Sequence, residues 1–195
     1  MTRLCLDVHG GISVHLPFAR GTAQCTTASG GYSTAMGEGS TASGSRSTAM
    51  GKSTTASDFA SVVIGQYNSS GSSVTNNATS FSTSNTAFVI GNGTSGSLSD
   101  AFKVMFNGDA TVSNDLTVSG DVNVSSDARL KANIASLGST IAKLLLIDGK
   151  SYTMKKDGKQ KIGVLAQDVQ KVFPELVSKD DNEMLAVNYQ GLVPV

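Results

Sequence analysis

Glycine recurs at a fixed position of a seven-residue repeat, and this spacing limits what the first half of the chain can fold into. The repeat begins at Thr27 and stays in phase for six copies to Asn68, with glycine at positions 30, 37, 44, 51 and 65. Heptads are typical of coiled coils, but glycine costs about 1 kcal/mol per helical position relative to alanine. These glycines, with the β-branched threonines that begin most copies, exclude a helix here.

Short extended segments separated by glycine turns fit the repeat instead. The third heptad position alternates between serine and a larger apolar residue, so the true repeat is 14 residues long. We predict a β-solenoid in which each repeat adds strands and corners. The expected interior residues are the small Ala35, Ala42 and Ala49, with Met36, Met50 and Ile64 filling wider gaps. The expected outward residues are Tyr32, Arg46, Lys52 and Gln66.

A disordered linker rich in serine, threonine and glycine is the alternative interpretation, but such a linker has no reason to keep apolar residues in phase. The Ala-x-Gly-x-x-Ser pattern over residues 27–68 resembles the head repeat of trimeric autotransporter adhesins. The resemblance implies a left-handed parallel β-roll contributed by each of three chains. The sequence departs from the pattern at Asp58, where glycine is expected.

Residues 69–125 lose this phase and are predicted to form a β-rich fibre or stalk, which begins at 69–86 with a polar connector or an irregular part of the fibre. Its expected strands lie at 87–93, 101–108, 109–113 and 116–124. The first two end in Asn-Gly, a strong turn former. The last alternates strictly, with one apolar face formed by Leu116, Val118, Val122 and Val124. We expect neighbouring protomers to cover these apolar faces with the same strands.

The charge composition changes near residue 125. Residues 27–125 hold three basic and six acidic residues, whereas residues 126–195 hold ten basic and eight acidic residues in a shorter span. The periodicity also changes, which predicts a small α+β unit. Its expected elements are a helix at 137–145, strands at 150–156 and 161–165 joined by an Asp157-Gly158 turn, a helix at 166–173 and a strand at 184–189. The predicted domains are thus a lead-in (1–20), a heptad-repeat β-roll (21–68), a stalk (69–125) and a C-terminal domain (126–195).

Several motifs of the C-terminal domain fall in one order that resembles the endosialidase-type intramolecular chaperone of phage tail spikes and tail fibres. The motifs are Ser126-Asp-Ala-Arg-Leu-Lys131, Ile162-Gly-Val-Leu-Ala-Gln-Asp-Val169, Phe173-Pro-Glu-Leu-Val177 and Val187-Asn-Tyr189. The resemblance implies a trimeric chaperone that helps the preceding fibre to fold and then cuts itself off. It also implies a further helix after Val195, so we expect the domain to be truncated there.

The resemblance implies a serine-lysine dyad at Ser126 and Lys131, which would act as a serine endopeptidase on the chain itself at the Ser125-Ser126 bond. A serine hydroxyl is a weak nucleophile unless a base takes its proton, and a lysine can serve only when burial or nearby cations favour its neutral form. Without the surrounding motif, a serine five residues before a lysine is a common coincidence. The neighbours Asp127, Arg129 and Asn133 are expected to hold the junction in shape. Structural roles are also expected for Gln167 and Asp168.

Together these features predict a mainly β protein: a trimeric β-solenoid or β-roll fibre followed by the chaperone domain. The first hypothesis is a tail-fibre or tail-spike-like homotrimer on the virion tail of a phage or prophage, which attaches to a host-surface glycan or protein receptor. The alternative is a trimeric adhesin or stalk on a bacterial cell surface, without proteolytic activity. A conventional glycan-cleaving enzyme needs paired carboxylates, and none pair in the sequence among Glu38, Asp58, Asp100, Asp109 and Asp115.

Other partners are not expected. The formal net charge is zero and neither half has a basic stripe, so we expect no nucleic-acid partner. No apolar run reaches the roughly 18 residues of a membrane span, so we expect no membrane insertion. We expect no cofactor and no metal, because the spacing of Cys5, Cys25, His9 and His15 does not match that of metal ligands. Cys5 and Cys25 are expected to be ordinary thiols.

Overall fold

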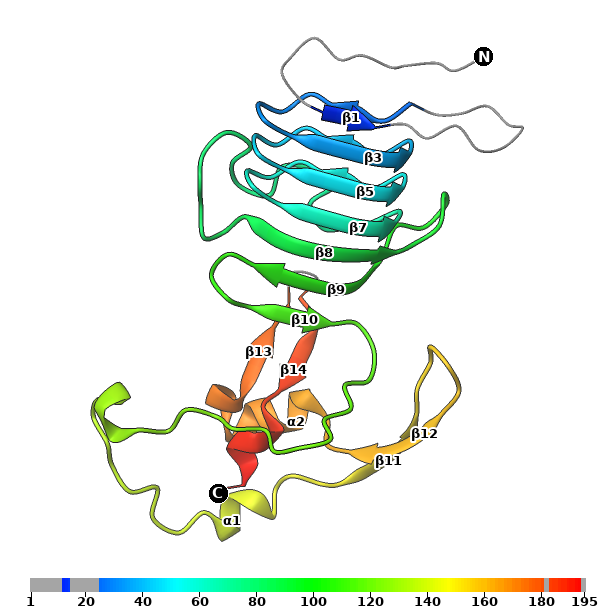
Figure 1. Ribbon diagram of the computed structural model, residues 1–195. Helices are drawn as coiled ribbons and strands as arrows, with labels where there is room; N and C mark the ends of the chain where they lie inside the picture. Colours follow the sequence, from blue (N-terminus) through cyan, green and yellow to red (C-terminus); the bar gives the residue numbers. More distant parts are fainter. Residues whose placement is uncertain (1–11, 15–24, 181–182, 194–195) are drawn as a thin grey trace. The chain divides into compact units, whose positions relative to one another are not determined.

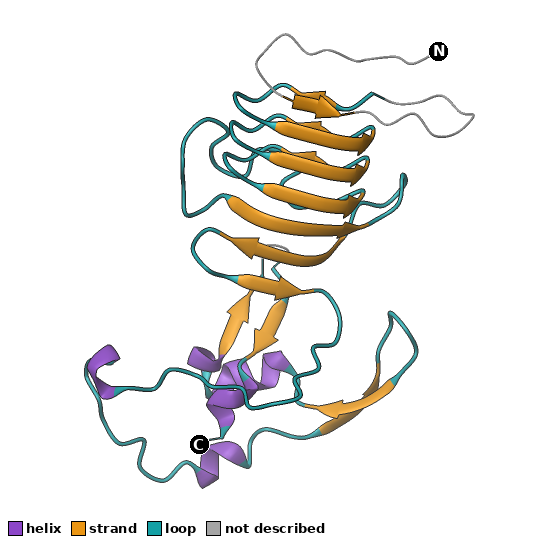
Figure 2. Ribbon diagram, viewed as in Figure 1, coloured by secondary structure: helices purple, strands orange, loops and turns teal. Residues whose placement is uncertain are grey.

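The computed structural model describes residues 12–14, 25–180 and 183–193. The chain divides into two compact units, Met1–Val122 and Asn123–Val195. Its fold is mainly β, as expected, and within the described ranges every helix lies in the C-terminal unit (Figure 2).

The N-terminal unit is built from two sheets (Figure 1). The larger sheet has seven strands, which in spatial order are β1 (Ile12–Val14), β3 (Thr34–Glu38), β5 (Thr48–Lys52), β7 (Val62–Gln66), β8 (Thr86–Asn92), β9 (Asp100–Met105) and β10 (Ala110–Val112). The smaller sheet has three two-residue strands, β2 (Thr27–Ala28), β4 (Thr41–Ala42) and β6 (Thr55–Ala56). Strands of the two sheets alternate along the chain from β2 to β7.

Within the repeats from β2 to β7, parallel strands pair at an interval of 14 residues. Thr34 is opposite Thr48, and Thr48 is opposite Val62; in the smaller sheet Thr41 is opposite Thr55. Each repeat therefore supplies one strand to each sheet, and equivalent residues of successive repeats form columns. The sequence predicted this 14-residue interval from the alternation at the third heptad position.

A narrow core of small side chains lies between the two sheets. Its apolar residues are fully buried: Ala28, Ala35, Ala42, Ala49, Ala56, Val63 and Val89. Buried serines line the same interior and donate their hydroxyl hydrogen bonds to backbone carbonyls, as Ser33 does to Gly30 and Ser47 does to Ala56. The prediction that Ala35, Ala42 and Ala49 face inward is confirmed.

The prediction that Met36, Met50 and Ile64 also face inward is wrong. Successive side chains of a strand point to opposite faces. Ala35 and Ala49 are fully buried, so the residues that follow them lie on the outer face of the larger sheet, where they are half-buried. The interior between the sheets is occupied by alanine, valine, serine and threonine.

Left-handed corners explain why the heptad is visible within the 14-residue repeat. Every seventh residue adopts a positive φ of 45° to 64°, at positions 32, 39, 46, 53, 60 and 67. Most of these are not glycine, although the left-handed region costs other residues about 1–2 kcal/mol. The corner residues Tyr32 and Arg46 are exposed, as predicted, and so are Lys52 and Gln66. The Arg46 guanidinium lies between the rings of Tyr32 and Phe59, at 5.6 Å and 5.2 Å from their centroids.

Glycine is required where one repeat lies directly against the next. A Cβ on Gly30 would lie 2.1 Å from the carbonyl oxygen of Gly44, and a Cβ on Gly44 would lie 2.1 Å from the carbonyl oxygen of Asp58. Asp58 escapes this restriction because an irregular segment, rather than another repeat, follows on that side. Its buried carboxylate accepts hydrogen bonds from the backbone N–H groups of Thr75 and Thr86, at 2.7 and 2.8 Å.

The same irregular segment closes the exposed edge of the smaller sheet. The buried Asn68 side chain accepts a hydrogen bond from the Thr55 N–H and donates one to the Thr55 carbonyl, as a further strand would. Residues 69–85 contain no helix or strand, so the segment is irregular up to the start of β8 at Thr86. The chain then rejoins the larger sheet at β8, parallel to β7, before β9 reverses the direction.

The expected strand at 109–113 is present as β10, after a turn with Gly108 at φ 96°. The predicted strand at 116–124 is wrong: residues 113–127 form neither helix nor strand, and Leu116 and Val124 are largely exposed. A strand needs a hydrogen-bonding neighbour, and the described residues of this single chain provide none here.

The C-terminal unit contains two hairpins and short helices. Its elements are η1 (Ala128–Leu130), α1 (Ile141–Leu144), β11 (Lys150–Thr153), β12 (Gln160–Gly163), α2 (Ala166–Val172), η2 (Pro174–Leu176), β13 (Val177–Lys179), β14 (Leu185–Val187) and η3 (Tyr189–Leu192). β11 pairs with β12 and β13 pairs with β14, both antiparallel. The predicted hairpin, second helix and final strand are confirmed, whereas β13 was not predicted.

The predicted helix at 137–145 is reduced to the four residues of α1. Leu137, Ile141 and Leu145 of its predicted apolar face are mostly exposed, and Leu144, the fourth residue of that face, is half-buried. Short helices depend on packing of such a face, so with most of it uncovered only one turn forms.

Two further expectations concern the start of the chain. Cys25 is disulfide-bonded, so the prediction of an ordinary thiol there is wrong. Residues 12–14 of the predicted lead-in form β1, which pairs in parallel with β3. The other residues of 1–20 lie outside the described ranges, as do Cys5, His9 and His15.

We expect Gly44→Ala to destabilise the N-terminal unit by about 2 kcal/mol or more, because the added methyl group meets a backbone carbonyl that belongs to the next repeat. Gly31→Ala is the matched control, since a Cβ there would meet only the Ser45 hydroxyl, at 3.8 Å. Thermal unfolding followed by circular dichroism measures both. Equal stability of the two variants would contradict the close packing of repeats.

Candidate functional site

The structure brings together the two residues that the sequence singled out. Lys131 Nζ donates a hydrogen bond to Ser126 Oγ at 2.7 Å. Both residues are exposed in the single chain. They lie on either side of the short 3-10 turn η1, so a local fold of six residues creates the contact.

Backbone hydrogen bonds make this turn. The Leu130 N–H donates to the Asp127 carbonyl and the Lys131 N–H donates to the Ala128 carbonyl, each at 3.1 Å. Asp127 is the N-cap, and its side chain accepts from the Arg129 N–H. Lys131 itself is extended, at φ −123° and ψ 143°, and its side chain returns to Ser126.

Asp127 and Arg129 form a forked ion pair beside this contact. Arg129 Nη2 lies 2.7 Å from Asp127 Oδ2, and Arg129 Nε lies 3.0 Å from Oδ1. The hydrogen bonds from the Arg129 side chain and then from its backbone N–H hold the pKa of the Asp127 carboxyl below its usual value. The carboxylate form is thus favoured, and acidification below that lowered pKa removes the pair.

The Ser125-Ser126 bond lies in an accessible part of the chain. Residues 113–127 form neither helix nor strand, and every residue from 111 to 139 is exposed. A peptide bond in such a segment can adopt the geometry that nucleophilic attack requires without unfolding a packed element.

The other motif residues have local structural contacts. Asn133 has a left-handed backbone, at φ 53°. The Asp168 carboxylate pairs with Lys171 at 3.0 Å, one helical turn further on. Gln167 lines a hollow of the C-terminal unit.

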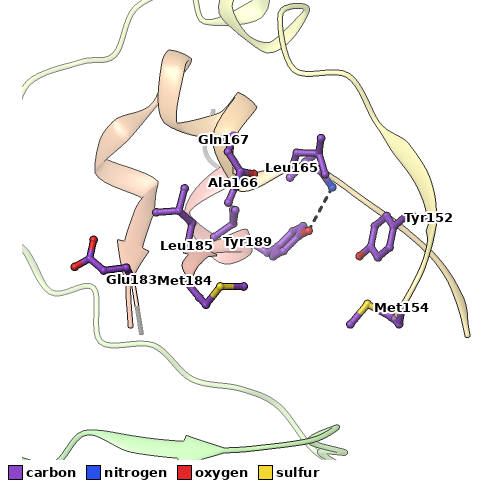
Figure 3. Close-up of a pocket in the computed structure, with 11 residues that line it drawn as sticks. Tyr152, Met154, Leu165, Ala166, Gln167, Glu183, Met184, Leu185 and Tyr189 are labelled. Carbon is purple, nitrogen blue, oxygen red and sulfur yellow. Dashed lines mark hydrogen bonds between the residues drawn. The ribbon is translucent and has the colours of Figure 1, made fainter. Parts of the chain in front are cut away.

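This hollow, of about 520 Å³, lies between the β11–β12 hairpin, the start of α2 and the segment from Glu183 to Tyr189 (Figure 3). Its lining is mostly apolar and includes Met154, Leu165, Met184 and Tyr189. The Val164 N–H donates to the Tyr189 hydroxyl at 3.4 Å, which joins two of its sides. The sequence did not predict the hollow, because its lining comes from three segments that no local pattern links.

In the described ranges, no group of three or more histidine, cysteine, aspartate or glutamate side chains is placed to hold a metal ion. No helix among those residues is long and apolar enough to cross a membrane.

Two family models match the chain. Residues 126–178 match the model of the chaperone of endosialidase, and residues 28–54 and 43–68 match two copies of the YadA head domain repeat. No curated protein and no solved structure matches. The two matched families confirm the architecture that the sequence motifs predicted, with head repeats preceding an endosialidase-type chaperone domain.

Proposed function

We propose that this chain is a tail-fibre or tail-spike-like protein that assembles as a homotrimer on the virion tail of a phage or prophage. Its C-terminal domain assists folding and trimerisation and then releases itself by cleaving the Ser125-Ser126 bond. The observation that carries the proposal is the 2.7 Å contact between Lys131 Nζ and Ser126 Oγ at the start of the matched chaperone segment.

The cleavage chemistry follows from this pair. A neutral Lys131 amine accepts the hydroxyl proton while Ser126 Oγ bonds to the carbonyl carbon of Ser125. The carbon–nitrogen bond then breaks, the leaving α-amine of Ser126 takes the proton from Lys131, and an ester joins Ser125 to Ser126 Oγ. Water hydrolyses the ester, which leaves a Ser125 carboxylate and restores the Ser126 hydroxyl.

Assembly is proposed to control this reaction. A general base must be neutral to act, and desolvation favours the neutral form of an amine. Ser126 and Lys131 are exposed in the single chain, so burial by neighbouring chains would supply the desolvation. Cleavage would then follow correct trimer formation instead of preceding it.

The outer face of the larger sheet supports trimer formation. Met36, Met50, Ile64, Ile90 and Phe102 are opposite one another on adjacent strands and are half-buried. This apolar column crosses five strands, and a second column beside it runs from Val62 through Phe88 to Val104.

The outer face of the smaller sheet is polar by contrast, with a threonine column of Thr27, Thr41 and Thr55. A sheet with one apolar outer face is expected to pack that face against other chains. We therefore propose that the repeats form a β-roll whose larger sheet faces the trimer axis. Residues 113–124, with their exposed leucine and valines, would be covered in the same assembly.

The second candidate function is a trimeric adhesin or stalk on a bacterial cell surface, without proteolysis. The matched YadA head repeats support this candidate as well as the fibre. Self-cleavage distinguishes the two. In both cases we propose a host-surface glycan or protein as the binding partner. Conventional glycan hydrolysis is disfavoured, because the carboxylates of Asp58 and Asp100 already accept hydrogen bonds from backbone N–H groups.

Ser126→Ala and Lys131→Ala should each abolish cleavage, because one removes the nucleophile and the other removes its base. Ser125→Ala is the matched control, which alters the same bond but keeps the dyad and should still be cut. Denaturing gels and intact-mass measurement of the full chain will detect a fragment that begins at residue 126. An uncut wild-type chain in a verified trimer would refute the proposed self-cleavage.

Met50→Glu should weaken the trimer by placing three charges in an apolar interface. Thr41→Glu makes the same change on the polar outer face of the smaller sheet and should leave the trimer intact. Sedimentation velocity measures the oligomeric state of both variants. The assignment of the interface fails if Thr41→Glu dissociates the trimer and Met50→Glu does not.

A further inference from the structure

Four lysines of the C-terminal unit form ion pairs with a carboxylate two to four residues away. The pairs are Lys150 with Asp148, Lys159 with Asp157, Lys171 with Asp168, and Lys179 with Glu183. Such a pair favours the charged amine, as the raised pKa of Lys150 illustrates, where the hydrogen bond and the charge of Asp148 are the main causes. A lysine in this arrangement is poorly suited to act as a base.

Lys131 also has a carboxylate four residues away in the sequence, on Asp127, but its amine contacts a different residue. Asp127 directly follows Ser126, whose hydroxyl oxygen lies 2.7 Å from the Lys131 amine, so its carboxylate is on the residue next to the one that Lys131 contacts. Lys131 Nζ nevertheless donates to Ser126 Oγ. Across residues 25–180 and 183–193, no ion pair is found for Lys131.

Arg129 accounts for this difference because it engages the Asp127 carboxylate. Its Nη2 and Nε contact both carboxylate oxygens, and its backbone N–H donates to Oδ1 at 2.8 Å. A guanidinium matches a carboxylate through two parallel hydrogen bonds, which an ammonium cannot do. The Arg129 side chain is 88% exposed, so this preference comes from geometry and not from burial.

We propose that Arg129 is a positioning residue that occupies the Asp127 carboxylate and so leaves the Lys131 amine to Ser126 alone. This inference rests on the proposed self-cleavage and explains how a lysine four residues from an aspartate can serve as its base. The charged groups beside Lys131 are Asp127 and Arg129; no other element in the described ranges gives it an ionic contact. Without Arg129, Asp127 would pair with the amine, which would then lose its proton only at higher pH.

The test measures the cleavage rate of the full chain as a function of pH in variants of this pair. Arg129→Gln should shift the rising limb of the rate–pH profile to higher pH by about one unit, so that cleavage near neutral pH becomes about tenfold slower. Asp127→Asn removes the competing charge but keeps an amide oxygen for the turn, so its midpoint should stay near that of the wild type. The double variant Asp127→Asn with Arg129→Gln should return to the wild-type midpoint.

The recovery in the double variant separates this role from a purely structural one. If Arg129 only shapes the turn, the double variant will cleave no faster than Arg129→Gln, and the rate will fall at every pH without a shift. A double variant that cleaves no faster than Arg129→Gln, or a rate that falls at every pH without a shift of the profile, overturns the inference. Sedimentation and circular dichroism verify that each variant is folded and trimeric.

Two failures remain distinguishable in this experiment. A wild-type trimer that is never cut refutes the proposed self-cleavage and the inference with it. A wild-type trimer that is cut, with an Arg129→Gln profile that coincides with it, refutes only the role of Arg129.

Discussion

The N-terminal unit depends on the close, in-register stacking of 14-residue repeats. Glycine at positions 30 and 44 lets one repeat approach the carbonyl groups of the next, with no room for a Cβ. The narrow interior is then filled by alanine, valine, serine and threonine, and buried serines satisfy backbone carbonyls. Because the interior is so narrow, the larger apolar residues lie outside, on a face suited to contact with other chains.

At the end of the stack, side chains make hydrogen bonds that the backbone of a further repeat would otherwise make. Asn68 makes the hydrogen bonds of a missing strand, and Asp58 holds the segment that covers the last repeat. Unpaired strand edges invite association with other chains, so their coverage favours association through the apolar face instead. The departure from glycine at Asp58 is thus part of how the repeat terminates.

The sequence predicted the features that depend on local pattern. These include the 14-residue interval, the inward alanines and the Ser126–Lys131 pairing, since the first two follow from periodicity and the third spans only six residues. It failed for Met36 and Met50, because these residues directly follow the inward alanines and successive side chains of a strand point to opposite faces. It also failed at 116–124 and 137–145, where the pattern specifies an apolar face that stays largely exposed among the described residues. The hollow and the Asp58 contacts join distant segments, which periodicity cannot reveal.

One measurement tests both the proposed assembly through the repeats and the proposed release through the dyad. Native mass spectrometry of the wild-type chain during refolding, at a series of protein concentrations, follows assembly and cleavage together. Trimers of intact chain should appear first, the fragment of residues 126–195 should form only from trimers, and dilution should slow its appearance. Cleavage of monomers at an undiminished rate, or a stable trimer that is never cut, would contradict the account.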